Sequence, residues 1–392
     1  AALNTDDLDL SALLGRAPRK IDQRAARRLI SGKRVMITGA GGTIGSELVR
    51  QAIAFDPEHV VLVDNAEFNL YQIDLEMREG GHAGRFTSSL TDVCNHEHLG
   101  RLMAQWRPEI VLHAAAFKHV PIVEENRCAG AMTNVYGAKN VFDAAIEARA
   151  ETVVFISTDK AVNPSSFMGA TKRIAELYAQ AQDVAQNDTR FVTVRFGNVL
   201  GSTGSVAPLF MRQIARGGPV TVTHPEISRY FMTTREAVQL VLHAASLDNR
   251  EESILTHDGR VFVLDMGEPV KILDFANRNI EAHGFVPNQD IELQFTGLRP
   301  GEKLFEEIFL DTDKLIKTGA DGVLLASPAM IDLPLLNPRL SDVVEHALGG
   351  NQAALDEAVL HLVPLVSPAM QRAPNHTNIN AEIQRDEGRA AR

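Results

Sequence analysis

The chain has 392 residues, of which 45% are hydrophobic and 23% charged, and it contains two cysteines. This composition excludes a mainly disordered, collagen-like or disulfide-rich protein and allows one large or two ordinary domains. The 39 Lys and Arg against 50 Asp and Glu give a net charge of −11, which argues against general nucleic-acid binding. Cys94 and Cys128 alone cannot form a cysteine-rich zinc site, and we expect no metal.

From Lys33 onward, short apolar runs alternate with longer helical stretches, as they do in βαβ units. The sequence predicts strands over Arg34–Thr38, His59–Val63, Gly84–Ser88, Ile110–His113, Thr152–Ser157 and Phe191–Arg195. The predicted helices include Thr43–Ala54, Gly137–Ala148 and Gly169–Asp183. Strands that are apolar throughout indicate a parallel sheet covered on both faces, so we expect an α/β fold with a doubly wound sheet.

Changes in composition divide the chain into five predicted regions. An Arg-rich lead-in covers residues 1–32, and the doubly wound domain covers 33–200. A smaller domain, richer in Gly and Pro, is expected over 201–330, with a helix over Val270–Glu281 and with segments such as the predicted strand Val261–Leu264 returning to the main sheet. A helical extension (331–372) and a flexible polar tail (373–392) complete the chain.

A glycine-rich turn joins the first predicted strand to the first helix. The turn and the helix start contain Gly39, Gly42, Thr43, Ile44 and Gly45. A pyrophosphate requires such a tight turn and the free N–H groups of a helix N-terminus, although a glycine triplet alone also fits an ordinary strand–helix turn. Asp64 ends the next strand, 19 positions after Gly45, where a carboxylate accepts hydrogen bonds from ribose hydroxyls. The sequence therefore predicts dinucleotide binding.

The same region also indicates which dinucleotide binds. The carboxylate of Asp64 repels a 2′-phosphate, and no Arg lies within residues 61–71 to receive one, so we expect NAD rather than NADP. Asp92, after the third strand, either meets the adenine edge or forms a turn, and the sequence favours neither.

The G-x-x-G-x-x-G spacing resembles the short-chain dehydrogenase/reductase superfamily. Its extended members add a smaller C-terminal substrate-binding domain to a Rossmann sheet. The resemblance directs attention to a Tyr-x-x-x-Lys pair on a later helix, where Lys172 is present but Met168 stands at the tyrosine position. All four tyrosines lie elsewhere, which counts against alcohol oxidation or sugar 4-epimerisation through a tyrosinate.

Thr158, Asp159 and Lys160 follow the predicted strand Thr152–Ser157. Ligands bind at the carboxyl ends of strands in open α/β sheets, and an adjacent acid and amine can donate and accept protons there. The alternative is a solvated ion pair in a loop. Because the pair lies between an apolar strand and the helix of Lys172, we favour the catalytic interpretation.

Thr158-Asp159-Lys160, followed by the run from Met168 to Arg173, resembles the UDP-N-acetylglucosamine 4,6-dehydratases of bacterial polysaccharide and glycan biosynthesis. More specifically, the chain is similar to the large, membrane-anchored type that makes precursors of bacillosamine and related amino sugars. The similarity runs from about Leu14 to Phe309 and includes the segments 113–121, 194–202, 228–233 and 297–303. Related glucose and mannose nucleotide dehydratases carry Asp-Glu in place of Asp159-Lys160 and keep the tyrosine.

This resemblance implies a reaction on the sugar of UDP-N-acetylglucosamine. C4 loses a hydride to NAD, Lys160 removes the C5 hydrogen, and Asp159, with a protonated carboxyl, protonates the departing C6 hydroxyl. The hydride then returns to C6, and the product is a UDP-4-keto-6-deoxy-N-acetyl sugar. Thr158, a water molecule or Lys160 itself remain candidates for accepting the C4 hydroxyl proton.

The resemblance also implies the binding residues. On the cofactor side these are, besides the turn, Asp64 and Asp92, the residues Val93, Ala114, Ala115, Lys118, Asn134, Lys172 and Val199. On the substrate side they are Lys118, Lys160, Asn198, Arg299 and Glu302. Arg suits a diphosphate because its planar fork donates two parallel hydrogen bonds, although Pro300-Gly301 is also an ordinary turn signal and Arg299 could lie on the surface.

Two other functions fit parts of the sequence. One is a nucleotide-sugar epimerase, which the missing tyrosine disfavours, and the other is a non-catalytic NAD-binding regulator, which the presence of Asp159, Lys160 and Lys172 disfavours. No run reaches the roughly 18 apolar residues of a membrane helix, and no signal peptide is seen. We expect a cytoplasmic homo-oligomer. Because the lead-in resembles the segment after the membrane helices of larger family members, we expect the cytoplasmic part of an inner-membrane protein.

Overall fold

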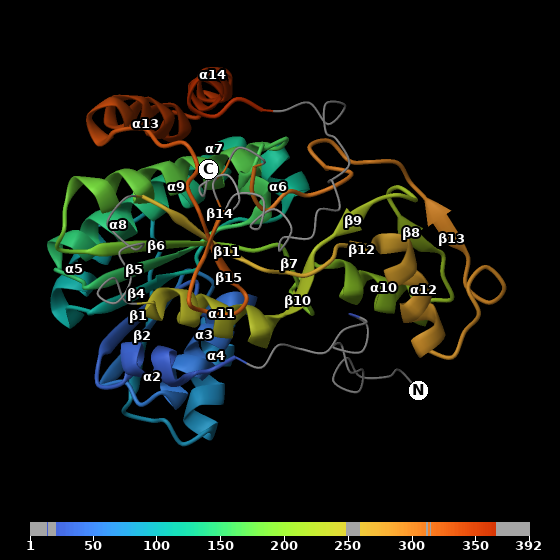
Figure 1. Ribbon diagram of the computed structural model, residues 1–392, viewed down its shortest axis with the longest axis horizontal. Coiled ribbons are helices and arrows are strands. Elements are labelled where there is room, and N and C mark those ends of the chain that lie inside the picture. Colours follow the sequence, from blue (N-terminus) through green and yellow to red (C-terminus); the bar gives the residue numbers. More distant parts are fainter. Residues whose placement is uncertain (1–13, 15–20, 248–258, 311–312, 314, 366–392) are drawn as a thin grey trace, which may run out of the picture.

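A nine-stranded sheet forms the centre of the molecule (Figure 1). The computed structural model describes residues 14, 21–247, 259–310, 313 and 315–365. In spatial order the sheet contains β14 (Leu315–Lys317), β15 (Val323–Ala326), β11 (Val261–Leu264), β6 (Arg190–Arg195), β5 (Thr152–Ile156), β4 (Ile110–His113), β1 (Arg34–Thr38), β2 (His59–Asp64) and β3 (Phe86–Leu90). Strands β3 to β11 of this order are parallel, and β15 and β14 continue the sheet antiparallel.

The order of the strands confirms the predicted doubly wound α/β fold. From β1 the chain proceeds outward to β2 and β3 and then crosses back to β4, so the direction of winding reverses between β1 and β4. In such sheets the crevice beyond the carboxyl ends of the strands at this reversal is the place where ligands bind. The glycine turn after β1 and the Thr158 loop after β5 both lie at this edge.

Helices cover both faces of the sheet (Figure 1). One face packs against α2 (Arg24–Ile30), α3 (Thr43–Ala54), α4 (Glu67–Glu79) and α11 (Thr234–Ser246). The opposite face packs against α5 (His96–Trp106), α7 (Arg127–Ala131), α8 (Ala138–Glu147) and α9 (Phe167–Ala185). Almost every residue of β1, β2, β5 and β6 is buried, which explains why these strands are mostly apolar.

Several predicted boundaries differ from those in the structure. The third strand begins at Phe86, not Gly84, because Gly84 has a φ of +86° and belongs to the preceding turn. The helix predicted from Gly137 is preceded by a π-helical turn, η2 (Met132–Gly137), and its α-helical part is α8. The predicted helix Val270–Glu281 starts with a two-residue strand, β12 (Val270–Lys271), that pairs with β9 (Ser228–Arg229), and α12 (Ile272–Ala282) follows.

A smaller unit lies beyond the carboxyl ends of the strands, at the right of Figure 1. It contains α10 (Val206–Ala215), β8 (Val220–Val222), α12 and β13 (Leu293–Phe295), and it has its own apolar core around Phe210, Phe231 and Phe275. Two short strands, β7 (Asn198–Leu200) and β10 (Phe231–Thr233), pair beside it. The chain leaves the sheet after β6, returns for β11, and leaves again before β14 and β15.

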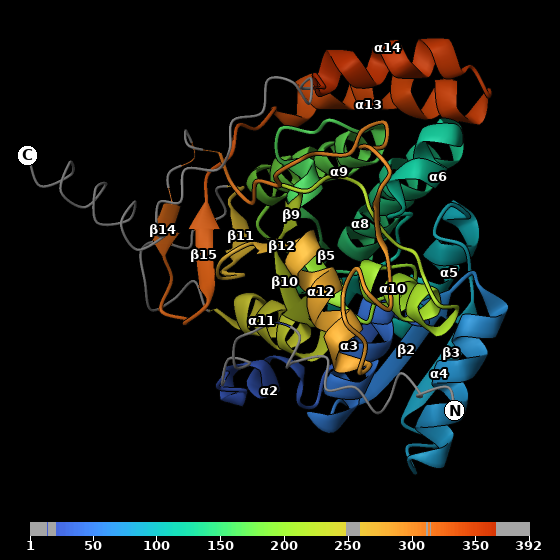
Figure 2. The ribbon, with the colours of Figure 1, turned by 90° about the vertical axis from the view of Figure 1, so that its right-hand side faces the viewer.

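A helical hairpin follows the last strand. Its helices are α13 (Leu333–Leu348) and α14 (Gln352–Leu362), which lie over α9 (Figure 2) and also contact α7. α6 (Val120–Glu125) lies close to the same layer. The predicted tail, 373–392, and most of the lead-in fall outside the described residues. No helix in the described part of the chain combines the length and apolar character that crossing a bilayer requires.

Candidate active site

The turn after β1 has the shape of a dinucleotide-binding turn. Gly39 has a φ of +69°, and a Cβ added there would lie 2.6 Å from the backbone nitrogen of Ala115. A Cβ at Gly45 would overlap the Gly39 carbonyl. Gly42 precedes α3 without a side-chain cap, so N–H groups of the helix N-terminus are left for a ligand. This turn fits the pyrophosphate of a dinucleotide cofactor. When bound, the dinucleotide would supply the hydride chemistry.

Asp64 at the end of β2 is fixed by the same turn. Its two carboxylate oxygens accept hydrogen bonds from the N–H groups of Gly41 and Ala66, each over 2.9 Å. A carboxylate offers about four acceptor positions, so Asp64 retains capacity for ribose hydroxyls. Asp92, by contrast, is exposed and accepts the Cys94 N–H over 2.8 Å, which is the turn-forming arrangement.

Two other predicted cofactor residues form hydrogen bonds with neighbouring parts of the protein. Val93 is buried, and its carbonyl accepts a hydrogen bond from Asn140. The Asn134 amide bonds to the N–H and carbonyl of Phe117 and to the Thr171 hydroxyl. Asn134 therefore holds the loop after β4 against α9 and has its side chain occupied by the protein itself.

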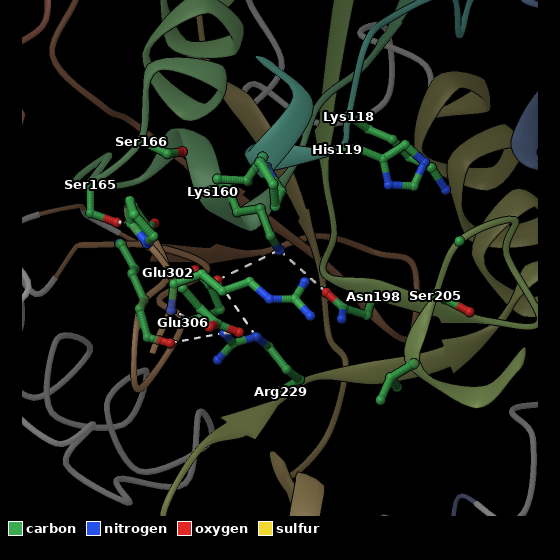
Figure 3. A pocket seen from close by; sticks show the side chains of 18 residues that line it. Lys118, His119, Lys160, Ser165, Ser166, Asn198, Ser205, Arg229, Glu302 and Glu306 are labelled. Carbon is green, nitrogen blue, oxygen red and sulfur yellow. Dashed lines mark hydrogen bonds and ion pairs between the residues drawn. The ribbon is translucent and has the colours of Figure 1, made fainter. Parts of the chain in front are cut away.

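Thr158, Asp159 and Lys160 form one hydrogen-bonded group at the end of β5. Asp159 and Lys160 begin a single 3₁₀ turn, η3 (Asp159–Ala161), for which Thr158 is the N-cap. Asp159 Oδ1 accepts the Thr158 hydroxyl over 2.8 Å and lies 3.0 Å from Lys160 Nζ. Lys160 Nζ also lies 3.3 Å from Asn198 Oδ1 (Figure 3). Asp159 Oδ1 therefore accepts hydrogen bonds from both of its neighbours.

The second oxygen of Asp159, Oδ2, has no hydrogen-bond partner among the residues that the structure describes. Asp159 itself is fully buried. A Cβ at Gly197 would lie 2.9 Å from that oxygen, so glycine leaves room for it there. A buried carboxylate oxygen without a partner is costly, and such atoms are commonly found where a ligand completes the site.

Two adjoining cavities meet at Lys160. One, of about 250 Å³, lies next to the glycine turn and is lined by Ile44, Ala114, Thr158, Met168, Lys172 and Val199 among others. The other, of about 230 Å³, is lined by residues of both units, including Arg229, Arg299, Glu302 and Glu306 (Figure 3). Lys118, His119, Lys160 and Asn198 line both cavities. A substrate in the second cavity would therefore reach the first one past Lys160.

Lys172 and Met168 both line the cavity next to the glycine turn. Lys172 Nζ donates to the Ile156 carbonyl over 2.7 Å and lies 4.1 Å from the centre of the Phe155 ring. Burial lowers the pKa of Lys172 to about 7. Met168 is buried in the adjoining turn of α9, so an apolar group stands at the position of the tyrosine in the Tyr-x-x-x-Lys pattern. A proton relay through this position is excluded.

The far end of the second cavity is held by the segment 299–308, here called the strap. Arg299 is exposed, and its backbone N–H donates to Glu302 Oε2 over 3.0 Å. The Thr223 hydroxyl donates to Glu302 Oε1 over 3.3 Å. At the other end of the cavity, partial burial and the charge of Lys160 lower the pKa of Lys118. The cavity thus presents cations from two sides, as a diphosphate requires.

Sequence reasoning missed Arg229, Tyr230 and Glu306. Arg229 donates to the carbonyls of Ser228 and Lys303, and it lies within ion-pair distance of Glu302 and Glu306.

Burial, and then nearby carboxylates including Asp159, raise the pKa of Tyr230 to about 12, which makes a tyrosinate unavailable near neutral pH. A carboxylate only three residues beyond the segment 297–303 was the signal that could have revealed Glu306. No group of three potential metal ligands occurs among the described residues.

Comparisons with known proteins show the family to which the chain belongs. A family model of polysaccharide biosynthesis proteins matches residues 35–328. The chain belongs to the polysaccharide biosynthesis protein family. Within this family it is 47% identical over 306 residues to the capsular polysaccharide biosynthesis protein CapD of Staphylococcus aureus, covering 78% of this chain and 50% of CapD. It therefore spans about half the length of such curated relatives.

Other similarities point to enzymes that act on nucleotide sugars. The chain is 31% identical to the UDP-N-acetylglucosamine 4,6-dehydratase (inverting) of Campylobacter jejuni strain 81-176, covering 77% of this chain and 85% of that protein. Among solved structures, Pen from Bacillus thuringiensis has a TM-score of 0.68 with 29% identity, over 77% of this chain and 92% of that one. The fold is shared with the dTDP-glucose 4,6-dehydratase DesIV of Streptomyces venezuelae, with a TM-score of 0.60 and 20% identity over 70% of this chain and 88% of that one.

Proposed function

We propose that this chain catalyses the NAD-dependent 4,6-dehydration of UDP-N-acetylglucosamine. The observation that carries the proposal is the Thr158–Asp159–Lys160 group at the junction of the two cavities, with Met168 at the tyrosine position. The relatives named as UDP-N-acetylglucosamine 4,6-dehydratases support the same reaction. The product is a UDP-4-keto-6-deoxy-N-acetyl sugar.

The C4 hydroxyl proton leaves first in this scheme. Thr158 lines the cavity next to the glycine turn, and its hydroxyl donates to Asp159 Oδ1. A C4 hydroxyl beside Thr158 can pass its proton through that hydroxyl to Asp159, while C4 loses its hydride. Asp159 thereby becomes the protonated acid that the later step requires.

Elimination of the C6 hydroxyl follows. The C4 ketone acidifies the C5 hydrogen, which Lys160 removes as the C6–O bond breaks. Asp159 gives its new proton to the departing oxygen, so the proton taken from the C4 hydroxyl leaves in the water molecule. Hydride is then returned to C6, and Lys160 returns its proton to C5.

The second cavity is the proposed site for the UDP group. Arg299 and Lys118 would contact the diphosphate, Asn198 would lie near it, and Glu302 would accept hydrogen bonds from the ribose. Glu302 is already oriented by Thr223 and by the Arg299 N–H, which reduces the ordering cost on binding.

We further propose that the chain acts as a homo-oligomeric cytoplasmic part of a longer, membrane-anchored protein.

The first test is incubation of the purified chain with UDP-N-acetylglucosamine and no added cofactor. We expect a product lighter by one water molecule, identified by mass spectrometry. Because the hydride removed from C4 is returned to C6 of the same sugar, the reaction should proceed through many turnovers without an external oxidant. An isomer of unchanged mass would indicate an epimerase instead, and an unaltered substrate would indicate a binding protein.

A second prediction concerns the bound nucleotide. Denaturing the purified protein should release NAD and not NADP, because the carboxylate of Asp64 is fixed by two backbone N–H groups at the ribose position. Chromatography of the supernatant against both standards measures this. Recovery of the 2′-phosphorylated form would show that the interpretation of Asp64 is wrong.

A further inference from the structure

Glu306 is a second buried carboxylate beside Lys160. Its side chain is 3% exposed, and Oε1 lies 3.6 Å from Lys160 Nζ and 3.7 Å from Arg229 Nε. Oε2 is buried and has no hydrogen-bond partner. Glu306 also lines the second cavity (Figure 3). One ammonium group therefore lies between the carboxylates of Asp159 and Glu306.

The strap that carries Glu306 is anchored to the loop that carries Lys160. Lys303 Nζ donates to the Val162 carbonyl over 2.8 Å, and the Ser165 hydroxyl donates to the Gly301 carbonyl over 3.0 Å. On the other side of the strap, Arg229 donates to the Lys303 carbonyl over 2.8 Å. These contacts hold Glu306 at its distance from Lys160 without a direct hydrogen bond between the two side chains.

This environment creates a difficulty for Lys160 as a base. Burial disfavours the ammonium form, but the charges of Asp159 and Glu306 outweigh burial and raise the pKa of Lys160. Arg229, Lys118 and Lys303 also face this group with positive charges. Lys160 is thus an ammonium group in the resting site and has to lose a proton before it can take one from C5.

We propose that Glu306 accepts the ammonium proton of Lys160 and thereby makes Lys160 the amine that removes the C5 hydrogen. This inference rests on the proposed dehydration. Once Asp159 has taken the C4 hydroxyl proton, it no longer stabilises the ammonium as an anion, and Glu306 is the remaining carboxylate within reach.

The proton count closes. Lys160 passes a proton to Glu306 and takes the C5 proton as the C5–H electron pair forms the C5–C6 double bond, while the C6–O bond breaks and water leaves with the proton of Asp159. When hydride is returned to C6, Lys160 gives its proton back to C5. Glu306 then returns its proton to Lys160. Glu306 acts through Lys160 and is a positioning, proton-accepting residue.

The test compares Glu306→Gln with wild type, with Glu306→Asp and with Glu307→Gln, using UDP-N-acetylglucosamine from about pH 6 to about pH 9. Glu307 lies on the same strap but pairs with Asn163 and Lys303, so its variant controls for the lost charge. At neutral pH we expect kcat of Glu306→Gln to fall by about 10²-fold or more, the usual size for a proton-transfer group. The ratio of the Glu306→Gln kcat to the wild-type kcat should rise by about tenfold per pH unit, because Lys160 in the variant must lose its proton to solvent.

Two further readouts complete the test. With Glu306→Gln, reduced dinucleotide should accumulate in its near-ultraviolet absorbance, since C4 oxidation precedes the blocked step. Glu306→Asp and Glu307→Gln should keep the pH profile of wild type. A kcat of Glu306→Gln that equals wild type, or that is lowered by the same factor at every pH, would overturn the proposal, the second result marking a structural role. Failure of wild type to release water would instead refute the dehydratase function.

Discussion

Replacing Lys160 with Met should allow hydride removal from C4 but stop the reaction before water is lost. In the proposed mechanism the C4 hydroxyl proton passes through the Thr158 hydroxyl to Asp159. The hydrogen bond between these two residues does not need the Lys160 amine. The C5 hydrogen, however, would lose its proposed base. Reduced dinucleotide should therefore accumulate with substrate present, while dehydrated product should fall by about 10²–10⁴-fold or more. Absorbance and mass spectrometry measure the two quantities on one sample.

Asp159→Asn should fail one step earlier. The amide cannot take the C4 hydroxyl proton from Thr158, so neither reduced dinucleotide nor product should form at more than a small fraction of the wild-type rate. Lys271→Met is a suitable control, because Lys271 pairs with Glu226 on the surface, away from both cavities. If Lys160→Met still exchanged the C5 hydrogen with deuterated solvent, or if Asp159→Asn still accumulated reduced dinucleotide, the assignment of roles would be wrong.

Glu176→Gln should destabilise the whole protein. Glu176 is fully buried on α9, and its two oxygens accept hydrogen bonds from Arg195 over 2.8 and 2.6 Å. The Ser157 hydroxyl and Arg173 also donate to it. Removing one partner of a buried ion pair leaves an uncompensated charge and costs about 3–5 kcal/mol. Thermal unfolding should shift down by several degrees, whereas Glu76→Gln at the exposed Arg50 pair should cost less than about 1 kcal/mol.

The same network predicts how acid affects stability. Burial raises the pKa of Glu176, but Arg195 and its hydrogen bonds prevail and lower it to about 2, from an ordinary value of 4.5. A carboxyl with a lowered folded-state pKa stabilises the fold above its ordinary value, and that contribution is lost as the pH falls from about 4.5 toward about 2. Glu176→Gln should remove this part of the acid sensitivity. An unchanged acid profile in the variant would contradict the ionised state of Glu176.

The sequence was informative wherever local pattern and chemistry coincide. The glycine turn, the apolar strands and the Asp159-Lys160 pair are all short-range features, and the structure brings their elements to one edge of the sheet. Glu306 and Arg229 reach the same place from segments more than sixty residues apart, through the strap and the pairing of β9 with β12. No local periodicity encodes that meeting, so it could not be predicted.

The strap joins two tasks that many enzymes assign to separate segments. Arg299 and Glu302 occupy one end of it and Glu306 the other, while Lys303 fastens its middle to the loop of Lys160. In the proposed mechanism, nucleotide binding by Arg299 and Glu302 and the protonation state of the Lys160 amine are therefore linked through fewer than ten residues. In such an arrangement the binding energy of a remote, unreacting group is used to align the reacting one. A sugar without its nucleotide handle would be a poor substrate because the amine would be misaligned, even when the sugar itself fills its place.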